Sequence, residues 1–238
     1  MFTLMKNLFP ILAVLTMAST CENNSADAPI RDFVIDAPVV NLSGADNAAR
    51  VQATEYNTPL LATGTISDER LKVIFLAEFD HPSFLKPIEE VFYLYGWGWD
   101  KNRYEDYSVS DPDAMGFELS SRVFRVYDSD GKRLDHFGLS EVVIGDEDSI
   151  ENSYDYDLDC IDYVYVDRDV TIKALDASLV AVSGPFMHNY FDLKLTRGWN
   201  KVWRRWMRPV DDNRFGGHRY ISPLPDEVET QWVLRRYD

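Results

Sequence analysis

The residues best suited to chemistry lie in two segments of opposite charge. Arg197–Arg208 (RGWNKVWRRWMR) holds five basic residues, no acidic residue and three of the six tryptophans. Asp146–Asp169 holds ten acidic residues and one basic residue, Arg168. Opposite charges favour contact between the two segments, although exposed ion pairs each contribute little.

A β-strand through the tryptophan-rich segment would give each face one aromatic ring and one guanidinium. The faces would carry Val202, Arg204 and Trp206, and Trp203, Arg205 and Met207. One interpretation is a ligand platform of Trp203, Arg205 and Trp206, because indoles stack on sugar rings and arginine binds carboxylates. We favour a structural alternative, in which one face lies in the core and the other packs on the acidic strands.

Two further tryptophans lie in Gly96-Trp97-Gly98-Trp99. On a strand Trp97 and Trp99 share a face, and the glycines expose the rings or allow a bend. The pattern fits an aromatic binding edge and a core plug equally well.

Within the acidic segment Asp155, Asp157 and Asp159 alternate. Oxygen ligands at this density suit Ca²⁺. An EF-hand loop would next need Gly and Glu, where this chain has Cys160 and Val166. The hypothesis is therefore an irregular Ca²⁺ site, and the alternative is a solvated acidic surface.

The sequence predicts no catalytic residue and no other cofactor. The four histidines have no metal-binding spacing, and no nucleophile elbow, P-loop or dinucleotide motif occurs. A hydrolytic, glycosidase-like pair of carboxylates stays open as an alternative, because acids are too abundant for the sequence to locate one. Cys160 lies among acids, which disfavour a reactive thiolate.

The N-terminus predicts export. Leu8–Met17 (LFPILAVLTM) is nearly all apolar and, at ten residues, is shorter than the roughly 20 residues of a spanning helix. Such a run matches the hydrophobic region of a signal peptide. The alternatives are a buried element of the fold and a signal peptide that is cleaved without lipidation.

Ala18-Ser19-Thr20-Cys21 resembles the lipobox of bacterial lipoproteins, although Thr20 and Ala18 depart from its usual residues. The resemblance implies that residues 1–20 are removed and that Cys21 is diacylated. Two acyl chains hold a protein stably on a membrane. We therefore expect a lipid-anchored protein of the bacterial cell envelope, periplasmic or surface-exposed. Without lipid, a Cys21–Cys160 disulfide is the alternative.

Composition restricts the remaining classes. The 238 residues are 45% hydrophobic and 13% aromatic, which is enough for a packed core. The net charge of −16 repels phosphate backbones, so nucleic acid is not an expected partner.

Runs rich in β-branched and aromatic residues, spaced about 8–12 residues apart, predict an all-β fold: an antiparallel β-sandwich, immunoglobulin-like or similar, built as one sandwich or two small ones. The expected strands are Leu60–Ile66, Arg70–Phe79, Glu90–Tyr95, Phe117–Tyr127, Lys132–Phe137, Leu139–Ile144, Ile161–Val166, Val170–Leu175, Leu179–Val182, Tyr190–Leu195, Lys201–Met207 and Val228–Tyr237. Helix is expected only at Asp46–Tyr56 and as one turn near Ser83–Val91. Asp128-Ser129-Asp130-Gly131 predicts a hairpin turn.

The predicted organisation has three parts. Residues 1–20 are the signal peptide, 21–55 a lipid-anchored tether and N-terminal extension, and 56–238 the body, with an internal boundary near 146–158 if there are two sandwiches. Polar, small and Pro residues directly after Cys21 predict a flexible tether.

Tyr163–Ile172 followed by Leu193–Val202 is similar to the strand–strand–"GWN" half of some β-rich bacterial surface lipoproteins of unknown activity. The resemblance implies a β-sandwich and export and brings no catalytic residues. Gly198 is expected to turn the chain, Trp199 to plug the end of the fold and Asn200 to bond the turn. The function expected from the whole sequence is non-enzymatic binding or scaffolding, with glycans or envelope proteins as partners; a carbohydrate-binding module and a hydrolase are the alternatives.

Overall fold

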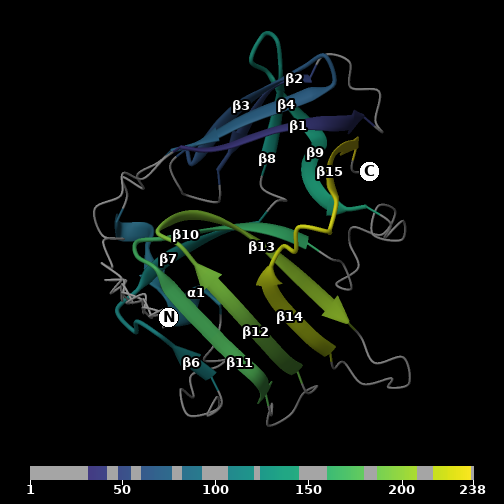
Figure 1. Ribbon diagram of the computed structural model, residues 1–238. Coiled ribbons are helices and arrows are strands. Elements are labelled where there is room, and N and C mark those ends of the chain that lie inside the picture. The colour runs from purple at the N-terminus through teal and green to yellow at the C-terminus, as the bar shows by residue number, and fades with distance from the viewer. Residues whose placement is uncertain are drawn as a thin grey trace, which may run out of the picture.

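The computed structural model describes residues 32–41, 48–54, 60–76, 82–92, 107–120, 124–144, 160–179, 187–207 and 217–236. These residues form two strongly curled β-sheets, one above the other in Figure 1, with little helix. The prediction of an all-β fold is confirmed.

The upper sheet is a closed barrel with the strand order β1-β15-β9-β8-β2-β3-β4. Its strands are β1 (Phe33–Asn41), β2 (Ala48–Ala53), β3 (Ala62–Ser67), β4 (Arg70–Phe75), β8 (Phe124–Asp128), β9 (Arg133–Val143) and β15 (Thr230–Arg236). Strands β1 and β15 of the barrel pair in parallel, and every other pair of neighbouring strands in the barrel is antiparallel.

The lower sheet has eight strands in the order β5-β7-β10-β13-β14-β12-β11-β6. They are β5 (Lys86–Pro87), β6 (Tyr107–Val109), β7 (Met115–Ser120), β10 (Cys160–Val166), β11 (Val170–Leu179), β12 (Met187–Leu195), β13 (Gly198–Met207) and β14 (Gly217–Pro223). The described helices are the short η2 (Pro82–Phe84) and α1 (Ile88–Val91). β12 and β14 form a second parallel pair.

Alternating side chains explain why the barrel strands close around a core. In β4, Leu71, Val73 and Phe75 are fully buried, and Lys72 and Ile74 between them are exposed. Period-two alternation of this kind gives a strand one apolar face, which must be buried. The strand expected at Arg70–Phe79 is therefore confirmed over Arg70–Phe75.

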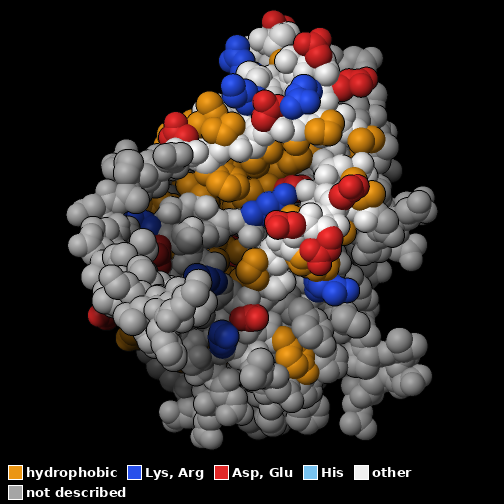
Figure 2. Space-filling model, viewed as in Figure 1, with side chains coloured by type: hydrophobic (Ala, Val, Ile, Leu, Met, Phe, Trp, Pro, Cys, Tyr) orange, Lys and Arg blue, Asp and Glu red, His pale blue; other side chains and the backbone are white. Residues whose placement is uncertain are grey.

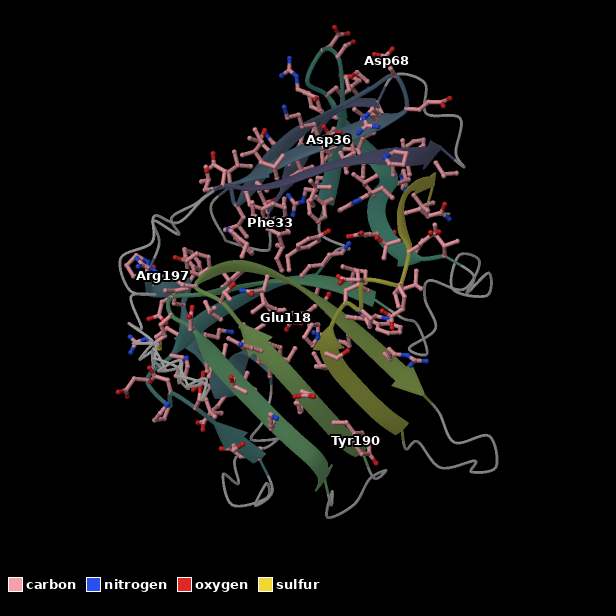
Figure 3. The ribbon with its side chains drawn as sticks, in the orientation of Figure 1. Phe33, Asp36, Asp68, Glu118, Tyr190 and Arg197 are labelled. Carbon is pink, nitrogen blue, oxygen red and sulfur yellow. The ribbon has the colours of Figure 1, made fainter. Side chains whose placement is uncertain are left out.

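The barrel and the sheet share one aromatic core. Phe75 of β4 lies 5.1 Å from Tyr163 of β10 and 4.9 Å from Trp199 of β13, measured between ring centroids. Tyr163 also stacks on Trp232 of β15 at 6.3 Å. Figure 3 shows Phe33 under β1, on the side of the barrel that faces the sheet. Contacts between aromatic rings stabilise the fold beyond the effect of burying the apolar area of each ring.

The opposite face of the lower sheet carries a second apolar cluster. It holds residues of α1, β10, β11, β12, β13 and β14, all buried. Its members include Ile88, Val91, Val164, Ile172, Leu193, Val202 and Ile221. Because β10 and β13 have an apolar cluster on each face, any polar side chain on them must find a partner in the interior.

Two turns follow the sequence prediction. Asp128–Gly131 joins β8 to β9, and Gly131 has a φ of +81°. Gly198 has a φ of +102° and opens β13. A side chain is strained at such angles, which is why glycine occupies both positions. The Asn200 amide donates to the carbonyls of Thr196 and Gly198 at 2.8 and 3.0 Å, which fixes the second turn.

Several predictions of secondary structure are corrected. The helix expected at Asp46–Tyr56 is β2, and the start of the strand expected at Glu90–Tyr95 lies in α1. Lys132–Phe137 and Leu139–Ile144 form one strand, β9. The helical turn expected near Ser83–Val91 is confirmed by η2 and α1.

The chain passes repeatedly between the two sheets. It crosses after β4, β7, β9 and β14, so neither sheet is made from one continuous stretch. β1 and β2 of the barrel come from the range 21–55 that the sequence analysis assigns to a tether and N-terminal extension, and the folded body starts by Phe33. The more specific prediction of an antiparallel immunoglobulin-like sandwich is not confirmed, since one layer is a closed barrel and two strand pairs are parallel.

Candidate functional site

The central strand β13 carries most of the predicted site and presents different chemistry on its two faces. It lies between β10 and β14. Trp199 and Trp203 pack against the core shared with the barrel, whereas Val202 belongs to the cluster on the opposite face. The predicted division of this strand into alternating faces is confirmed for these residues.

On the barrel side Trp203 and Arg205 form a cation–π pair. The Arg205 guanidinium carbon lies 4.6 Å from the centroid of the Trp203 ring. Arg205 is exposed and Trp203 is half-buried, so the indole is partly core and partly surface. The Trp203 Nε1 is buried and has no hydrogen-bond partner in the described part of the chain. The pair presents a cation held over an aromatic ring, an arrangement that suits an anionic ligand.

On the other face Arg204 joins two acidic residues. Its guanidinium contacts the Glu118 carboxylate and lies 3.0 Å from an oxygen of Asp162. The Asp162 side chain is 2% exposed, and those of Glu118 and Arg204 are 18% and 28% exposed. Glu118, labelled in Figure 3, lies on β7, the second strand from one edge of the lower sheet. This contact ties β7, β10 and β13 together and places one base beside the buried Asp162 and the partly exposed Glu118.

The contact also tests the predicted attraction between the two charged segments. Arg204 belongs to the basic segment and Asp162 to the acidic one, and they meet as expected. The interpretation favoured from the sequence has one face of the tryptophan-rich strand packed on the acidic strands. In the structure β10 and β13 are instead paired side by side in one sheet. Asp162 pairs with Val202 along the ladder, which sets Arg204 on the same face two residues away.

A buried polar cluster lies where the barrel meets the sheet, and the sequence analysis missed it. We call it the Glu141 cluster: Glu141 of β9, Tyr163 of β10, Lys201 of β13 and Thr230 of β15. The Glu141 carboxylate accepts hydrogen bonds from the Tyr163 hydroxyl, the Lys201 ammonium and the Thr230 hydroxyl. Lys201 also donates to Thr230 at 3.1 Å.

Burial defines the electrostatics of this cluster. The Glu141 side chain is 4% exposed and that of Lys201 is 28% exposed. Burial raises the pKa of Tyr163 well above its usual value, and the neighbouring Glu141 charge raises it further. Tyr163 therefore stays neutral and acts as a donor. A carboxylate held by three donors has little capacity left for a substrate, so we interpret the cluster as a structural link.

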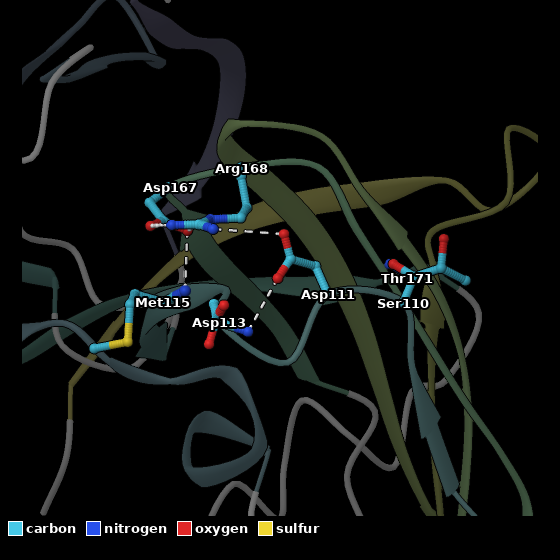
Figure 4. Close-up of polar contacts among 7 residues, drawn as sticks. All are labelled: Ser110, Asp111, Asp113, Met115, Asp167, Arg168 and Thr171. Carbon is cyan, nitrogen blue, oxygen red and sulfur yellow. Dashed lines mark hydrogen bonds and ion pairs between the residues drawn. The ribbon is translucent and has the colours of Figure 1, made fainter. Parts of the chain in front are cut away.

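Part of the acidic segment is likewise used in structural contacts (Figure 4). Asp167 accepts a hydrogen bond from the backbone N–H of Met115 at 2.9 Å and pairs with the neighbouring Arg168 at 3.1 Å. Arg168 also reaches Asp111 at 3.5 Å. Hydrogen bonding to Asp167 raises the pKa of the Arg168 guanidinium. These bonds fasten the loop before β7 to the turn after β10.

Several predicted site residues lie outside the described residues: Cys21, Trp97, Trp99, Asp155, Asp157 and Asp159. Trp206 is described only through its backbone, which pairs with Arg219 in β14. Within the described ranges no group of three or more His, Cys, Asp and Glu side chains is arranged to hold a metal ion. The Ca²⁺ site at the three aspartates stays a prediction.

The comparisons with known proteins give no match: no family model matches the sequence, and neither a curated protein nor a solved structure does. No helix among the described residues is long and apolar enough to cross a membrane.

Proposed function

We propose that the chain is an exported, lipid-anchored β-protein that binds or scaffolds an envelope partner without catalysis. The proposal joins the lipobox-like Cys21 to a folded body whose strand β1 starts twelve residues later, at Phe33. We also propose that the barrel and the lower sheet act as the two layers of a sandwich-like body.

The observation that carries a binding role is the Trp203–Arg205 pair on β13. It combines an exposed cation with a rigid aromatic ring. Lys201 and Arg204 on the same strand are only partly exposed and contact acidic side chains of neighbouring strands. Lys201 and Arg204 therefore support the fold, and Arg205 is the charged side chain of this trio that faces solvent.

The anchoring part is tested by labelling growing cells with a radioactive or clickable fatty acid. The wild-type chain is expected to incorporate the label and to fractionate with membranes, and Cys21→Ala is expected to lose both. Cys160→Ala is the matched control and should keep both. Label on Cys21→Ala, or an unlabelled wild-type chain, would contradict the anchor.

A second candidate is binding of acidic sugars, and the same pair favours it. A sugar carboxylate would pair with the Arg205 guanidinium, and the ring would stack beside the indole. We therefore expect acidic glycans to bind more tightly than their neutral counterparts.

The experiment is a glycan array followed by affinity measurements on four proteins. Arg205→Gln removes the charge at an exposed position, and Trp203→Phe keeps an aromatic ring but removes the indole N–H. Arg197→Gln, at the exposed position just before the start of β13, is the control. Loss of about 1.5–3 kcal/mol of binding free energy in Arg205→Gln alone would support a charged hydrogen bond to the ligand. Equal binding by the wild type and all three variants would rule out the Trp203–Arg205 pair as the binding site.

A further inference from the structure

Strand β1 has a ladder partner on only one side for most of its length. It pairs with β4 from Phe33 to Pro38, whereas its ladder with β15 covers only Val39 to Asn41. No other described strand pairs with β1. Residues 33–36 therefore form an open strand edge within the described part of the chain, which we call the β1 edge. In Figure 1 β1 lies along the lower margin of the barrel.

The hydrogen-bond pattern of β1 decides which backbone groups point to this edge. The N–H of Val39 donates to the carbonyl of Glu69, directly before β4, at 2.8 Å. Because successive residues of an antiparallel ladder point alternately toward and away from the partner strand, the odd-numbered residues of β1 bond to β4. The N–H and C=O groups of Val34 and Asp36 therefore point to the β1 edge. Pro38 has the same parity, at a position where the ladder with β4 needs no N–H.

The side chains of the β1 edge are incompletely covered. Phe33 and Ile35 pack against the barrel core but are only half-buried, whereas the inward residues of β4 are fully buried. Val34, on the outer side, is 48% exposed. Figure 2 shows hydrophobic side chains at the surface along this lower margin of the barrel. An added strand with apolar residues at alternate positions would bury the remaining area of Phe33 and Ile35.

Contacts on its inner and outer sides hold the β1 edge in an extended form. Phe33 packs on Phe75 with ring centroids 5.3 Å apart and on Tyr163 of the lower sheet at 5.8 Å. On the outer side Asp36 pairs with Arg70 at 2.6 Å. An edge that is already extended loses little conformational entropy when a partner binds. Because Tyr163 belongs to β10, the lower sheet lies beside this end of β1, which favours a thin, extended segment over a second folded domain.

The backbone groups of the β1 edge define the class of its occupant. A row of alternating N–H and C=O groups is matched by the backbone of another extended polypeptide, as in strand addition to a sheet edge. A second copy of the chain is disfavoured, because each copy carries a net charge of −16. The same charge, with exposed Asp32 directly before the edge, favours a segment that carries basic rather than acidic residues.

We infer that the β1 edge binds an extended, basic segment of a partner protein by strand addition, with apolar residues of that segment beside Phe33 and Ile35. The inference rests on the proposed function in one respect, that the chain binds an envelope protein, and it names the class of that partner. The backbone contact itself requires neither acylation of Cys21 nor the Arg205 side chain.

The first test is amide hydrogen exchange of the full chain without ligand, resolved by residue with NMR. The amides of Val34 and Asp36 should exchange fast, whereas those of Ile35 and Ala37, which face β4, should exchange slowly. This alternation is the signature of an open edge, and the odd-numbered positions serve as the internal control. Slow exchange at all four positions would show that another part of the chain or a second copy already covers the edge, and would overturn the proposal.

The second test adds a synthetic peptide, acetyl-Lys-Val-Thr-Val-Thr-Val-Lys-amide, as the probe. Binding should slow amide exchange at Val34 and Asp36 and leave Ile35 and Ala37 unchanged. The control peptide has Pro-Pro in place of the central Val-Thr, lacks donors there and should not bind. Absence of binding by the first peptide, or binding that leaves exchange at Val34 and Asp36 fast, refutes strand addition.

Two variants separate the backbone edge from the apolar surface around it. Val34→Pro removes an edge donor at a position with the parity of Pro38 and should weaken peptide binding about three- to tenfold, the effect of one hydrogen bond. Ile74→Thr is the control, because Ile74 is 38% exposed beside Val34 but its strand is paired on both sides. It should bind as the wild type does. Undiminished binding by Val34→Pro, or an equal loss in both variants, contradicts the proposal, and the exchange measurements on the wild type decide independently of whether Val34→Pro folds.

Fatty-acid labelling of Cys21 and glycan binding by Arg205→Gln test the proposed function separately. A labelled chain that does not bind the peptide refutes strand addition and leaves the anchor intact. Protection of Val34 and Asp36 by the peptide in a chain without label supports strand addition and contradicts the anchor alone.

Discussion

Replacing Glu141 by Gln should destabilise the protein substantially, because this residue joins the barrel to the sheet. Its carboxylate accepts from Tyr163, Lys201 and Thr230, which come from three other strands. Glutamine has nearly the same shape but only one acceptor oxygen, and its amide nitrogen would face donors. The substitution therefore removes charge and acceptors without leaving a cavity.

The expected loss follows from burial. A buried hydrogen bond to a charged group contributes about 1.5–3 kcal/mol, and the Tyr163 hydroxyl has no exposure that would let water replace its acceptor. The Lys201 ammonium is 28% exposed and keeps part of its hydration, so the lost ion pair adds no more than about 1 kcal/mol. We expect Glu141→Gln to lower the free energy of unfolding by about 2–4 kcal/mol.

Denaturant unfolding followed by tryptophan fluorescence measures this change, because Trp232 and Trp199 are buried beside Tyr163 and Phe75. The midpoint should fall without a change in slope. The control Glu90→Gln, at an exposed position on α1, should stay within about 0.5 kcal/mol of the wild type.

A double-mutant cycle makes the reasoning refutable. Tyr163→Phe removes one donor, and combining it with Glu141→Gln should give a coupling energy of about 1–2 kcal/mol. A loss below about 1 kcal/mol in Glu141→Gln, or strictly additive effects, would show that the cluster does not link the two sheets energetically.

Three further outcomes are expected. Gly198→Ala should cost about 1–2 kcal/mol in denaturant unfolding, because alanine is strained at a φ of +102°. Asn200→Ala should cost about 1–3 kcal/mol by the same assay, since its amide bonds to Thr196 and Gly198 are lost. Burial and the hydrogen bond to Glu89 raise the pKa of Tyr107 from 10.0 to about 12. Its contribution to stability is thus complete below pH 10 and lost as the pH rises to about 12, so Tyr107→Phe should flatten the alkaline part of the stability profile.

Local physical rules account for the parts of the fold that the sequence predicts. The strand β4 and the glycine turns at Gly131 and Gly198 depend on a few neighbouring residues, and the structure has them as expected. The burial of Trp199 and the bonds of Asn200 also follow from the local motif.

β2 shows where local rules fail. Its sequence, AARVQA, consists mostly of good helix formers and predicts a helix. The structure makes it a strand because Val51 and Ala53 face the barrel interior and are fully buried. Packing in a closed barrel outweighs the small preference of each residue for helix. Likewise the parallel pairing of β1 with β15 joins the two ends of the chain, and no local pattern indicates it.

The candidate site likewise has one part that the sequence predicts and one part that it does not. Opposite charge on the two segments was enough to predict that they meet, and the structure shows that Arg204 and Asp162 make this contact. The Glu141 cluster needed knowledge of the topology, because Lys201 and Glu141 are 60 residues apart and lie in different sheets.

One signal could have indicated the Glu141 cluster. Leu139–Val143 is apolar apart from Ser140 and Glu141, and all five residues are buried, so both faces of this part of β9 are covered. A charged residue in a strand covered on both faces cannot reach water, whichever way it points. A single carboxylate in such a run therefore requires a base and other donors from elsewhere in the chain. Lys201, the one lysine within Arg197–Arg208, was the candidate for the base that pairs with Glu141.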